Sequence, residues 1–533
     1  MEPERKRKVS AVWDHFDLLT ANKVKCRICS AELSFTNKST SSMLRHYRVK
    51  HENEEEANTP RTNTESRKIA LDQAVLNFII KDCQPLSIVE SEGFRGLIQA
   101  LDPSYVLPTR KTVKEMMAKK HAEELERVKR EVQQAVAVSI TADMWTSLNM
   151  EAYLALTCHY ISDNMQLCTS VLGVKHFPQS HTADNLAQVK RGMMNDWAIT
   201  NKVRCLVTDA APNMIAATRT LQIRHSICIA HKLNLIVKKS CDQIPELSSI
   251  RHKSWQIVSF FRSSTTAKEK LAQMQQQMGQ PTLKLVNEVP TRWNSTYQML
   301  SRLHDEKEAV WVSLASLQTD LTPLTADEFN ILREALLVLA PFHQATVELS
   351  EERRVSGSKV IPMMKMLNCA LERNSLHLHT QAATHLHDQL RRRVTDTASN
   401  LESLSVLTLS TLLDPRFKTL GFRSSSKCNH LWQQLDQEVG RQTTNATADS
   451  IIEVQRYLAE GNISRQEDPL TYWGNRKTSY PHLFHLALQF LCTPASSVPC
   501  ERVFSKAGEI VSKKRNRLNA NTLDKLIFLN KNL

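Results

Sequence analysis

The chain has little glycine and no long hydrophobic run. Its 533 residues include only 11 glycines, and this scarcity favours a helix-rich fold over a glycine-rich all-β build. No stretch approaches the roughly 20 apolar residues that a membrane-spanning helix needs. Residues 1–8 (MEPERKRK) lack the apolar region of a secretory signal. We therefore expect no membrane partner.

The cysteine spacing also lacks the pattern of a disulfide framework. The twelve cysteines are scattered along the chain, so we expect reduced thiols inside a cell. The hydrophobic fraction of 41% is ordinary for a globular protein. At this length one compact core is excluded, and three or more domains are expected.

Negative charge is outweighed by positive charge. The net charge is +14, and residues 1–51 hold eleven Lys and Arg against five Asp and Glu, a local balance of 11 − 5 = +6. This excess suits a polyanionic partner. Basic clusters at residues 5–8 and 513–515 are candidate nuclear import signals or phosphate contacts. We therefore expect a nuclear protein, although such clusters also occur as ordinary solvated surface.

Two cysteines and two histidines near the N-terminus have the spacing of a closed zinc site. A Cys-x2-Cys pair is followed after sixteen residues by a His-x4-His pair, and two thiolates with two imidazoles suit tetrahedral Zn²⁺. Residues 23–35 alternate as a hairpin does, and residues 39–50 are typical of a helix. The alternative is two chance pairs in a helical domain. The predicted ligands are Cys26, Cys29, His46 and His51.

Aromatic residues ahead of the ligands refine this prediction. With Trp13 and Phe16, and a longer interval between ligand pairs than the common two-Cys two-His finger has, residues 9–51 resemble a BED-type zinc finger. The resemblance implies binding to double-stranded DNA. Five polar residues on or beside the predicted helix are candidate phosphate or base contacts: Ser41, Ser42, Arg45, Arg48 and Lys50.

After the finger, residues 52–67 are polar and predict a disordered linker. Residues 68–134 carry helical apolar spacing and predict a helical segment.

A mixed α/β pattern follows. Strand-like runs occupy residues 136–142, 153–161, 167–177, 203–208 and 224–230, with predicted helices at 184–200 and 232–240. This order is that of an RNase H-like fold. Strands one and four are neighbours there, so Asp143 and Asp209 would face one another at their ends. Paired carboxylates suit Mg²⁺ in phosphoryl transfer, but single solvated acids at strand ends are also common.

The last part of the chain carries several further motifs. It contains DPLTYWGNRK, SSVPCERVFS and RNRLNANTLDKL, and here the chain resembles the hAT superfamily of transposases and their domesticated BED-finger descendants. The resemblance implies a catalytic triad of Asp143, Asp209 and Glu501 with Mg²⁺. It also implies a homodimer or higher homo-oligomer. The apolar runs at 480–491 and 521–529 need a partner surface in the core or on a second chain.

Three further motifs match the same family. Cys228 and His231 match its pair beside the active site, where a structural or positioning role is favoured over metal. Arg292 and Trp293 match its Arg-Trp pair, in which an exposed Trp would stack on an extruded base and the Arg would contact a phosphate. The alternative for Trp293 is helix packing. Packing is also expected for residues 412–417 (LLDPRF).

We therefore predict a multidomain α+β protein. Its parts are a small BED ββα zinc finger at 9–51, a linker at 52–67, a helical segment at 68–134, the first part of an RNase H-like α/β core at 135–244, a large all-α insertion at 245–465, and the completion of the core with the hAT dimerisation region at 466–533.

Three functions are compatible with this organisation. The first is a dimeric, zinc-dependent nuclear DNA-binding protein of transposase descent that regulates transcription. The second is an active cut-and-paste transposase, and the third is a dimeric assembly protein. The sequence leaves open whether the acids still perform catalysis.

Overall fold

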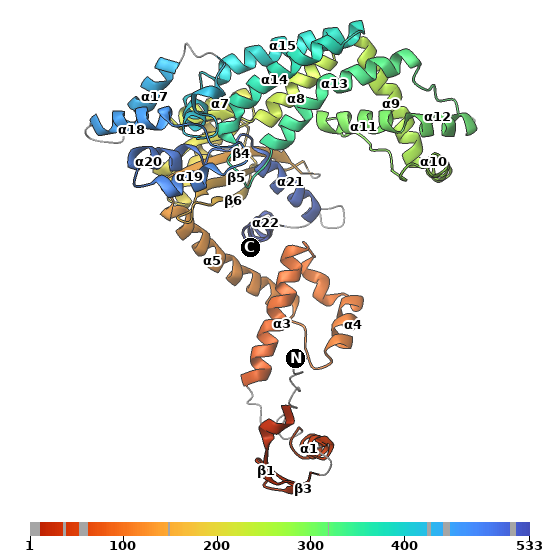
Figure 1. Ribbon diagram of the computed structural model, residues 1–533, viewed down its shortest axis with the longest axis vertical. Helices are drawn as coiled ribbons and strands as arrows, with labels where there is room; N and C mark the ends of the chain where they lie inside the picture. The colour runs from red at the N-terminus through yellow and green to blue at the C-terminus, as the bar shows by residue number, and fades with distance from the viewer. Residues whose placement is uncertain are drawn as a thin grey trace, which may run out of the picture. The chain divides into compact units, whose positions relative to one another are not determined.

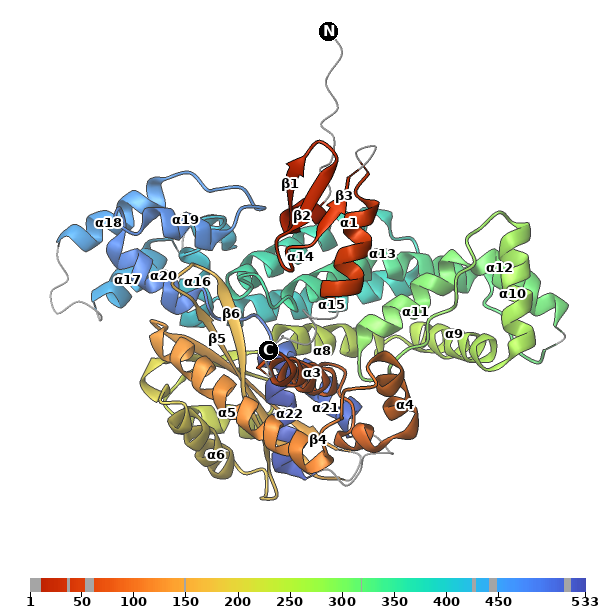
Figure 2. The ribbon, with the colours of Figure 1, turned by 90° about the horizontal axis from the view of Figure 1, so that it is seen from below.

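The computed structural model (Figures 1 and 2) describes residues 11–35, 39–52, 62–147, 150–317, 319–423, 428–440, 448–511 and 519–533. The basic clusters at 5–8 and 513–515 lie outside this part of the chain. The chain divides into two compact units, Met1–Met116 and Met117–Leu533.

The first unit begins with a small three-stranded sheet and one helix. A 3-10 turn (Ala11–His15) leads into β1 (Phe16–Thr20), β2 (Lys23–Cys26), β3 (Glu32–Ser34) and α1 (Ser41–Tyr47), followed by a π turn at Arg48–Glu52. The predicted hairpin and helix are present, and β1 extends the hairpin by pairing antiparallel with β2. The buried core comprises Val12, Phe16, Val24, Cys26, Phe35 and Met43.

The helical segment of this unit starts earlier than predicted. Helix α3 spans Thr62–Lys81, followed by a 3-10 turn (Leu86–Glu90) and α4 (Glu92–Leu101). The predicted linker at 52–67 is therefore wrong from Thr62 onward, while residues 53–61 lie outside the described residues. Residues 65–68 are helical but fully exposed. An exposed helical turn has the same polar composition as a disordered linker, so composition did not distinguish them.

Helix α5 (Arg110–Gln134) crosses the boundary between the units and leads into the large sheet of the second unit. The sheet elements are β4 (Val138–Thr146), β5 (Ala152–Ile161), β6 (Leu167–His176), α6 (Ala183–Asp196), a 3-10 turn (Thr200–Lys202), β7 (Val203–Thr208), α7 (Pro212–Thr220), β8 (Arg224–Ile227) and α8 (Ile229–Cys241). Strand order is β6-β5-β4-β7-β8. The first three strands pair antiparallel, and β7 pairs parallel with both β4 and β8. The predicted RNase H-like order is confirmed.

An all-helical region follows α8, comprising the insertion predicted at 245–465 and the first two helices of the predicted C-terminal part. Its helices are α9 (Pro245–Ser263), α10 (Thr265–Gln277), α11 (Trp293–Asp305), α12 (Lys307–Ser316), α13 (Ala326–Leu349), α14 (Val360–Asn374), α15 (Gln381–Leu401), α16 (Ser405–Leu412), α17 (Cys428–Gly440), α18 (Ala448–Ala459), α19 (Pro469–Arg476) and α20 (Pro481–Phe490), with 3-10 turns at Gly357–Lys359, Ser375–His377 and Lys418–Gly421. Helices α9–α12 and the start of α13 share one apolar core. A second core joins the later helices to the sheet.

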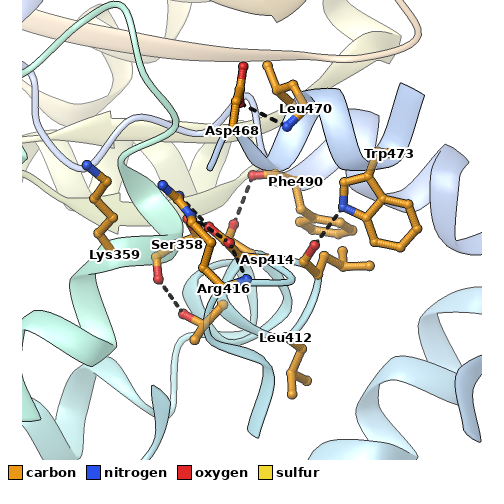
Figure 3. A network of polar contacts seen from close by, with 12 residues as sticks. Ser358, Lys359, Leu412, Asp414, Arg416, Asp468, Leu470, Trp473 and Phe490 are labelled. Carbon is orange, nitrogen blue, oxygen red and sulfur yellow. Dashed lines mark hydrogen bonds and ion pairs between the residues drawn. The ribbon is translucent and has the colours of Figure 1, made fainter. Parts of the chain in front are cut away.

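Residues 412–417 tie the later helices together through a buried polar network (Figure 3). The Asp414 carboxylate has no exposed surface and accepts hydrogen bonds from the Arg416 guanidinium at 2.9 and 2.6 Å and from the Ser358 hydroxyl. The Trp473 indole N–H donates to the Leu413 carbonyl at 2.8 Å. This segment therefore packs α16 against the 3-10 turn before α14 and against α19, as expected.

The chain ends with α21 (Val498–Ile510) and α22 (Ala520–Asn532). Helix α21 packs on β4 and β5, and α22 packs along β6. The apolar runs that were expected to need a partner find it within the same chain, because Leu483, Phe490, Leu523 and Phe528 are all buried. Among the described helices, none combines the length and apolar character needed to span a bilayer.

Candidate functional site

Two pairs of ligands converge in the finger. Cys26 ends β2, Cys29 lies in the following turn, His46 lies on α1 and His51 lies in the π turn. One ligand atom from each residue lies within 4.8 Å of the others. The individual separations are 3.4 Å for Cys26 Sγ–His51 Nε2, 3.2 Å for Cys29 Sγ–His46 Nε2 and 3.3 Å for both His51 Nε2–Cys29 Sγ and His51 Nε2–His46 Nε2.

These separations fit the edges of a zinc tetrahedron. Metal–ligand bonds of about 2.3 Å to sulfur and about 2.0–2.1 Å to nitrogen place neighbouring ligand atoms about 3.3–3.8 Å apart. Burial lowers the pKa of His46, and the nearby charges of His51 and Lys50 lower it further. A neutral imidazole is the form that binds metal. The residues therefore fit Zn²⁺, which would supply much of the folding energy of so small a unit.

A basic face lies next to the ligands. Arg45 on α1 and Arg48 and Lys50 in the π turn are exposed, and within the described residues none of them forms an ion pair. Ser41 is exposed at the start of α1. The Ser42 hydroxyl donates to the Ser34 carbonyl at 3.1 Å, so it also ties α1 to β3. Four of the five predicted contact residues are thus exposed to a partner.

The two aspartates lie on neighbouring parallel strands. Thr141 of β4 pairs with Val207 of β7, and Asp143 and Asp209 each follow two residues later. The Asp143 carboxylate accepts a hydrogen bond from the Met144 N–H at 2.8 Å, and the Asp209 carboxylate accepts one from the Ala211 N–H at 3.3 Å. Asp143 lies inside β4 rather than at its end, because the strand continues to Thr146.

Glu501 reaches the same region from the first turn of α21. The thiol of the preceding residue, Cys500, is buried and lies 3.1 Å from the Thr141 hydroxyl. The Ser497 N–H donates to the Cys228 thiol at 3.3 Å. These contacts fix the start of α21 against both β4 and the end of β8, although more than 350 residues separate Thr141 from Cys500 along the chain (|i−j| = 359).

The helical insertion also contacts the segment that precedes α21. The Gly357 N–H donates to the Thr493 carbonyl at 3.1 Å, the Ala495 N–H donates to the Ser356 hydroxyl at 3.1 Å, and the Ser496 hydroxyl donates to the Leu349 carbonyl at 3.1 Å. A Cβ at Gly357 would collide with the Thr493 carbonyl oxygen. The turn between α13 and α14 therefore helps to position α21.

The charges of the three acids affect one another. Burial raises the pKa of Asp143 to about 7, the Met144 hydrogen bond partly offsets this rise, and the charges of Asp209 and Glu501 add to it. Mutual repulsion of this kind is what bound cations relieve. The carboxylates are less tightly gathered than the finger ligands: in the described residues, only the finger places three or more such ligand atoms within 4.8 Å of one another. The Arg292 guanidinium lies 4.0 Å from the Glu501 carboxylate.

Lys190 also lies beside this site, and nothing in the sequence predicted its position there. Its side chain on α6 is fully buried, and its ammonium contacts the Met214 sulfur at 3.4 Å. Burial lowers the pKa of Lys190 to about 8, and the Asp209 carboxylate opposes this shift. A single lysine on an amphipathic helix is normally exposed, so no sequence signal distinguished it.

Cys228 and His231 form a helix cap. The Cys228 thiol accepts a hydrogen bond from the His231 N–H at 3.5 Å and is the N-cap of α8. Burial raises the pKa of this thiol, which disfavours the thiolate that would bind a metal. The Cys228 thiol therefore joins the end of β8, the start of α8 and the residue before α21.

Trp293 does not present an exposed ring. It is only 4% exposed and packs edge-on against Tyr297 and His343. The expectation of base stacking is therefore wrong in this conformation, because the first turn of α11 directs the ring into the apolar core, and the packing alternative holds. Arg292, one residue earlier, stays exposed and lies beside Glu501.

Four family models match successive parts of the chain. They are a BED zinc finger at residues 10–52, a ZBED1 RNase-like domain at 141–235, a ZBED1 RNase-like helical domain at 226–335 and the hAT family C-terminal dimerisation region at 453–533.

Relatives carry the same arrangement over long stretches. Zinc finger BED domain-containing protein 4 of Homo sapiens is 25% identical over 100% of this chain and 52% of its own length. Zinc finger BED domain-containing protein 6 of Mus musculus is 22% identical over 91% of this chain and 57% of its own length. The transposable element Hobo transposase of Drosophila melanogaster is 25% identical over 67% of this chain and 55% of its own length.

The chain thus spans about half the length of these relatives. Its finger, RNase-like core and C-terminal region each match their own model, and the structure supplies the corresponding folds. The chain thus combines an N-terminal BED zinc finger with a C-terminal hAT dimerisation region, as its matches to BED-finger proteins and hAT transposases indicate.

Proposed function

We propose that this chain is a nuclear, zinc-dependent DNA-binding protein that acts as a dimer and regulates transcription. One observation carries the proposal: a closed Cys2His2 group stands next to three exposed cations, Arg45, Arg48 and Lys50, that have no acidic partner in the described residues. Phosphates of duplex DNA would provide those partners, and base edges would provide specificity.

The finger is tested with binding sites selected from random duplex DNA. Arg45→Ala together with Arg48→Ala is expected to weaken binding at least ten-fold and to reduce the salt dependence by about one unit for each phosphate that is no longer neutralised. Lys25→Ala is the matched control, because Lys25 is exposed on β2 away from α1. Equally weakened binding in both variants would contradict the proposed DNA face.

The dimer is supported by the match of residues 453–533 to the hAT dimerisation region. Because the apolar faces of α20 and α22 are covered within the chain, the dimer interface would use other surfaces of this region. Analytical ultracentrifugation of the full chain is expected to give twice the 60.7 kDa chain mass. A monomer at micromolar concentration would contradict this part of the proposal.

A second candidate function is DNA transposition. It is favoured by the placement of the three acids: Asp143 and Asp209 follow paired residues of β4 and β7, and Cys500, which precedes Glu501, contacts Thr141 of β4 at 3.1 Å. Asp143, Asp209 and Glu501 would hold Mg²⁺, which supplies charge stabilisation for phosphoryl transfer. Arg292 would contact a phosphate of the DNA strand at this site.

An excision assay on matched transposon ends separates the two functions. The enzyme hypothesis predicts excision by the wild-type chain and its loss in Asp209→Asn. If both proteins are equally inert, transposition is excluded for those ends while finger-dependent DNA binding stands. An assembly role would be favoured instead if Cys26→Ser left chromatin association unchanged.

A further inference from the structure

A hollow lies on the helical insertion, far along the chain from the finger. It is formed by α9, α10 and the extended segment between α10 and α11, and it has a volume of about 250 Å³. Figures 1 and 2 show α9, α10, α11 and α12 gathered at one end of the helical layer. We call it the insertion hollow. Its lining residues include three cations and no acid: Arg262, Lys268 and Lys284 are joined by Gln275 and apolar side chains.

The cations of the insertion hollow lack acidic partners. The Arg262 guanidinium donates to the Leu285 carbonyl at 3.1 Å, and the guanidinium of a fourth cation, Arg302, donates to the Lys284 carbonyl at 3.3 Å. Within the part of the chain that the structure describes, none of Arg262, Lys268, Lys284 and Arg302 forms an ion pair. The three like charges that line the hollow repel one another unless an anion offsets them.

This lack of partners contrasts with neighbouring cations of the same insertion. Arg251 pairs with Glu288 at 3.0 Å, and Lys253 pairs with Glu328 at 2.7 Å. Lys359 pairs with Glu348 at 2.9 Å. These three cations have acidic partners, whereas the cations that line the insertion hollow have none among the described residues.

The hollow also offers fixed polar groups. Both arginines are held by backbone carbonyls of adjacent residues, which orients their remaining N–H donors. Gln275 is 1% exposed, and its amide N–H group donates to the Leu283 carbonyl at 3.0 Å and to the Glu306 carboxylate at 2.8 Å. Its amide oxygen has no donor in the described structure. A ligand with anionic oxygens would pair with the exposed cations of this set.

We propose that the insertion hollow binds the phosphodiester backbone of DNA and gives the body of the protein a contact that does not depend on the finger. The inference rests on the proposed DNA-binding function, which makes duplex DNA the polyanion at hand. Nucleic acid supplies phosphates for the three cations that line the hollow.

The test uses the full chain and a fluorescent duplex, with binding followed by anisotropy at several salt concentrations. In a Cys26→Ser background, which removes the finger, the duplex is expected to bind with a marked salt dependence. Adding Lys268→Gln and Lys284→Gln should lower the remaining affinity about ten-fold and the salt slope by about two units. Both side chains are exposed and form no ion pair in the described residues, so the fold should be unaffected.

Lys119→Gln with Lys477→Gln is the matched control, since these lysines are also exposed but lie on α5 and at the end of α19. An equal fall in affinity in the control would overturn the proposal, as would absence of binding in the Cys26→Ser background alone. Displacement of the duplex by polyglutamate as effectively as by unlabelled duplex would assign the hollow to acidic peptides and overturn it too. Unchanged affinity on Cys26→Ser, with the loss on Lys268→Gln and Lys284→Gln still present, would instead contradict only the finger's role.

Discussion

A single buried histidine makes the stability of the sheet depend on pH. His159 on β5 is 2% exposed and lies between the hydroxyls of Thr157 and Thr169, each at 3.0 Å. Burial lowers its pKa to about 3. Below the unfolded value of about 6.5 the unfolded chain binds a proton that the folded chain does not, so stability falls as the pH falls.

The expected loss of stability from His159 alone is about 1.4 kcal/mol between pH 7.5 and 5.5. His159→Gln keeps polar groups near both threonines but does not titrate. Denaturant unfolding of both proteins at the two pH values is expected to show that difference. An identical pH dependence in the variant would mean that folding does not change the pKa of His159.

The roles of some residues could be predicted from the sequence, and those of others could not. The zinc ligands were predictable because one metal imposes a fixed spacing on four residue types. Lys190 and Trp293 were not, since a buried lysine and a buried tryptophan depend on neighbours that converge only in the fold. The spacing of a motif reflects local geometry but does not reveal which face of a helix meets the core.

Among the elements, α22 protects an edge of the sheet. Strand β6 is at the end of the strand order. On its outer side, the Val174 N–H donates to the Asp524 carboxylate at 2.7 Å and the Val171 N–H donates to the Asn532 side-chain oxygen at 2.9 Å. The Asn532 amide also donates to the Val171 carbonyl at 3.0 Å. Unpaired edge strands invite pairing with other chains.

Asp524→Ala with Asn532→Ala is expected to destabilise the chain by about 2–4 kcal/mol, since two backbone N–H groups lose their partners. It should also increase aggregation near the melting temperature, measured by light scattering during a thermal ramp. Lys531→Ala, an exposed change on the same helix, controls for altered helix charge. Equal behaviour of the two variants would show that α22 does not protect the edge.

Strands with a clear apolar pattern could be predicted from the sequence. The exact ends of strands, which depend on their pairing partners, could not. The strands of the large sheet lie where apolar runs predicted them, since buried parallel strands need continuous apolar sequence. Strand β4 nevertheless runs four residues beyond the predicted end at Ala142, through polar Asp143 to Thr146. Its partner β5 supplies the hydrogen bonds there, and such pairing is invisible in one segment read alone.

For the whole molecule, the division into two units predicts two responses to metal removal. A chelator is expected to unfold the finger, since its ligands belong to the first unit, while the melting transition of residues 117–533 stays unchanged. Calorimetry with and without chelator measures this. Cys29→Ser should reproduce the effect without chelator, whereas Cys369→Ser, at an exposed cysteine of the second unit, should not. A shift of the body transition on chelation would contradict the prediction.

At this scale the sequence indicated the sheet and its completion by the last part of the chain, through resemblance of that part to a known family. It did not indicate that the end of α13 and the turn before α14 form hydrogen bonds with residues 493–496. Bonds from backbone groups and single serines of distant segments leave no pattern in the sequence, so only the folded arrangement reveals them.

The bond between the Ser139 and Thr493 hydroxyls, at 3.0 Å and 354 residues apart, also bears on synthesis. At the usual rate of translation, roughly 20–70 s pass between the appearance of these two residues from the ribosome. Throughout that interval the nascent sheet lacks the two helices that finish it. The growing chain therefore exposes apolar surface until these helices are synthesised. We expect chaperones to bind this surface during translation.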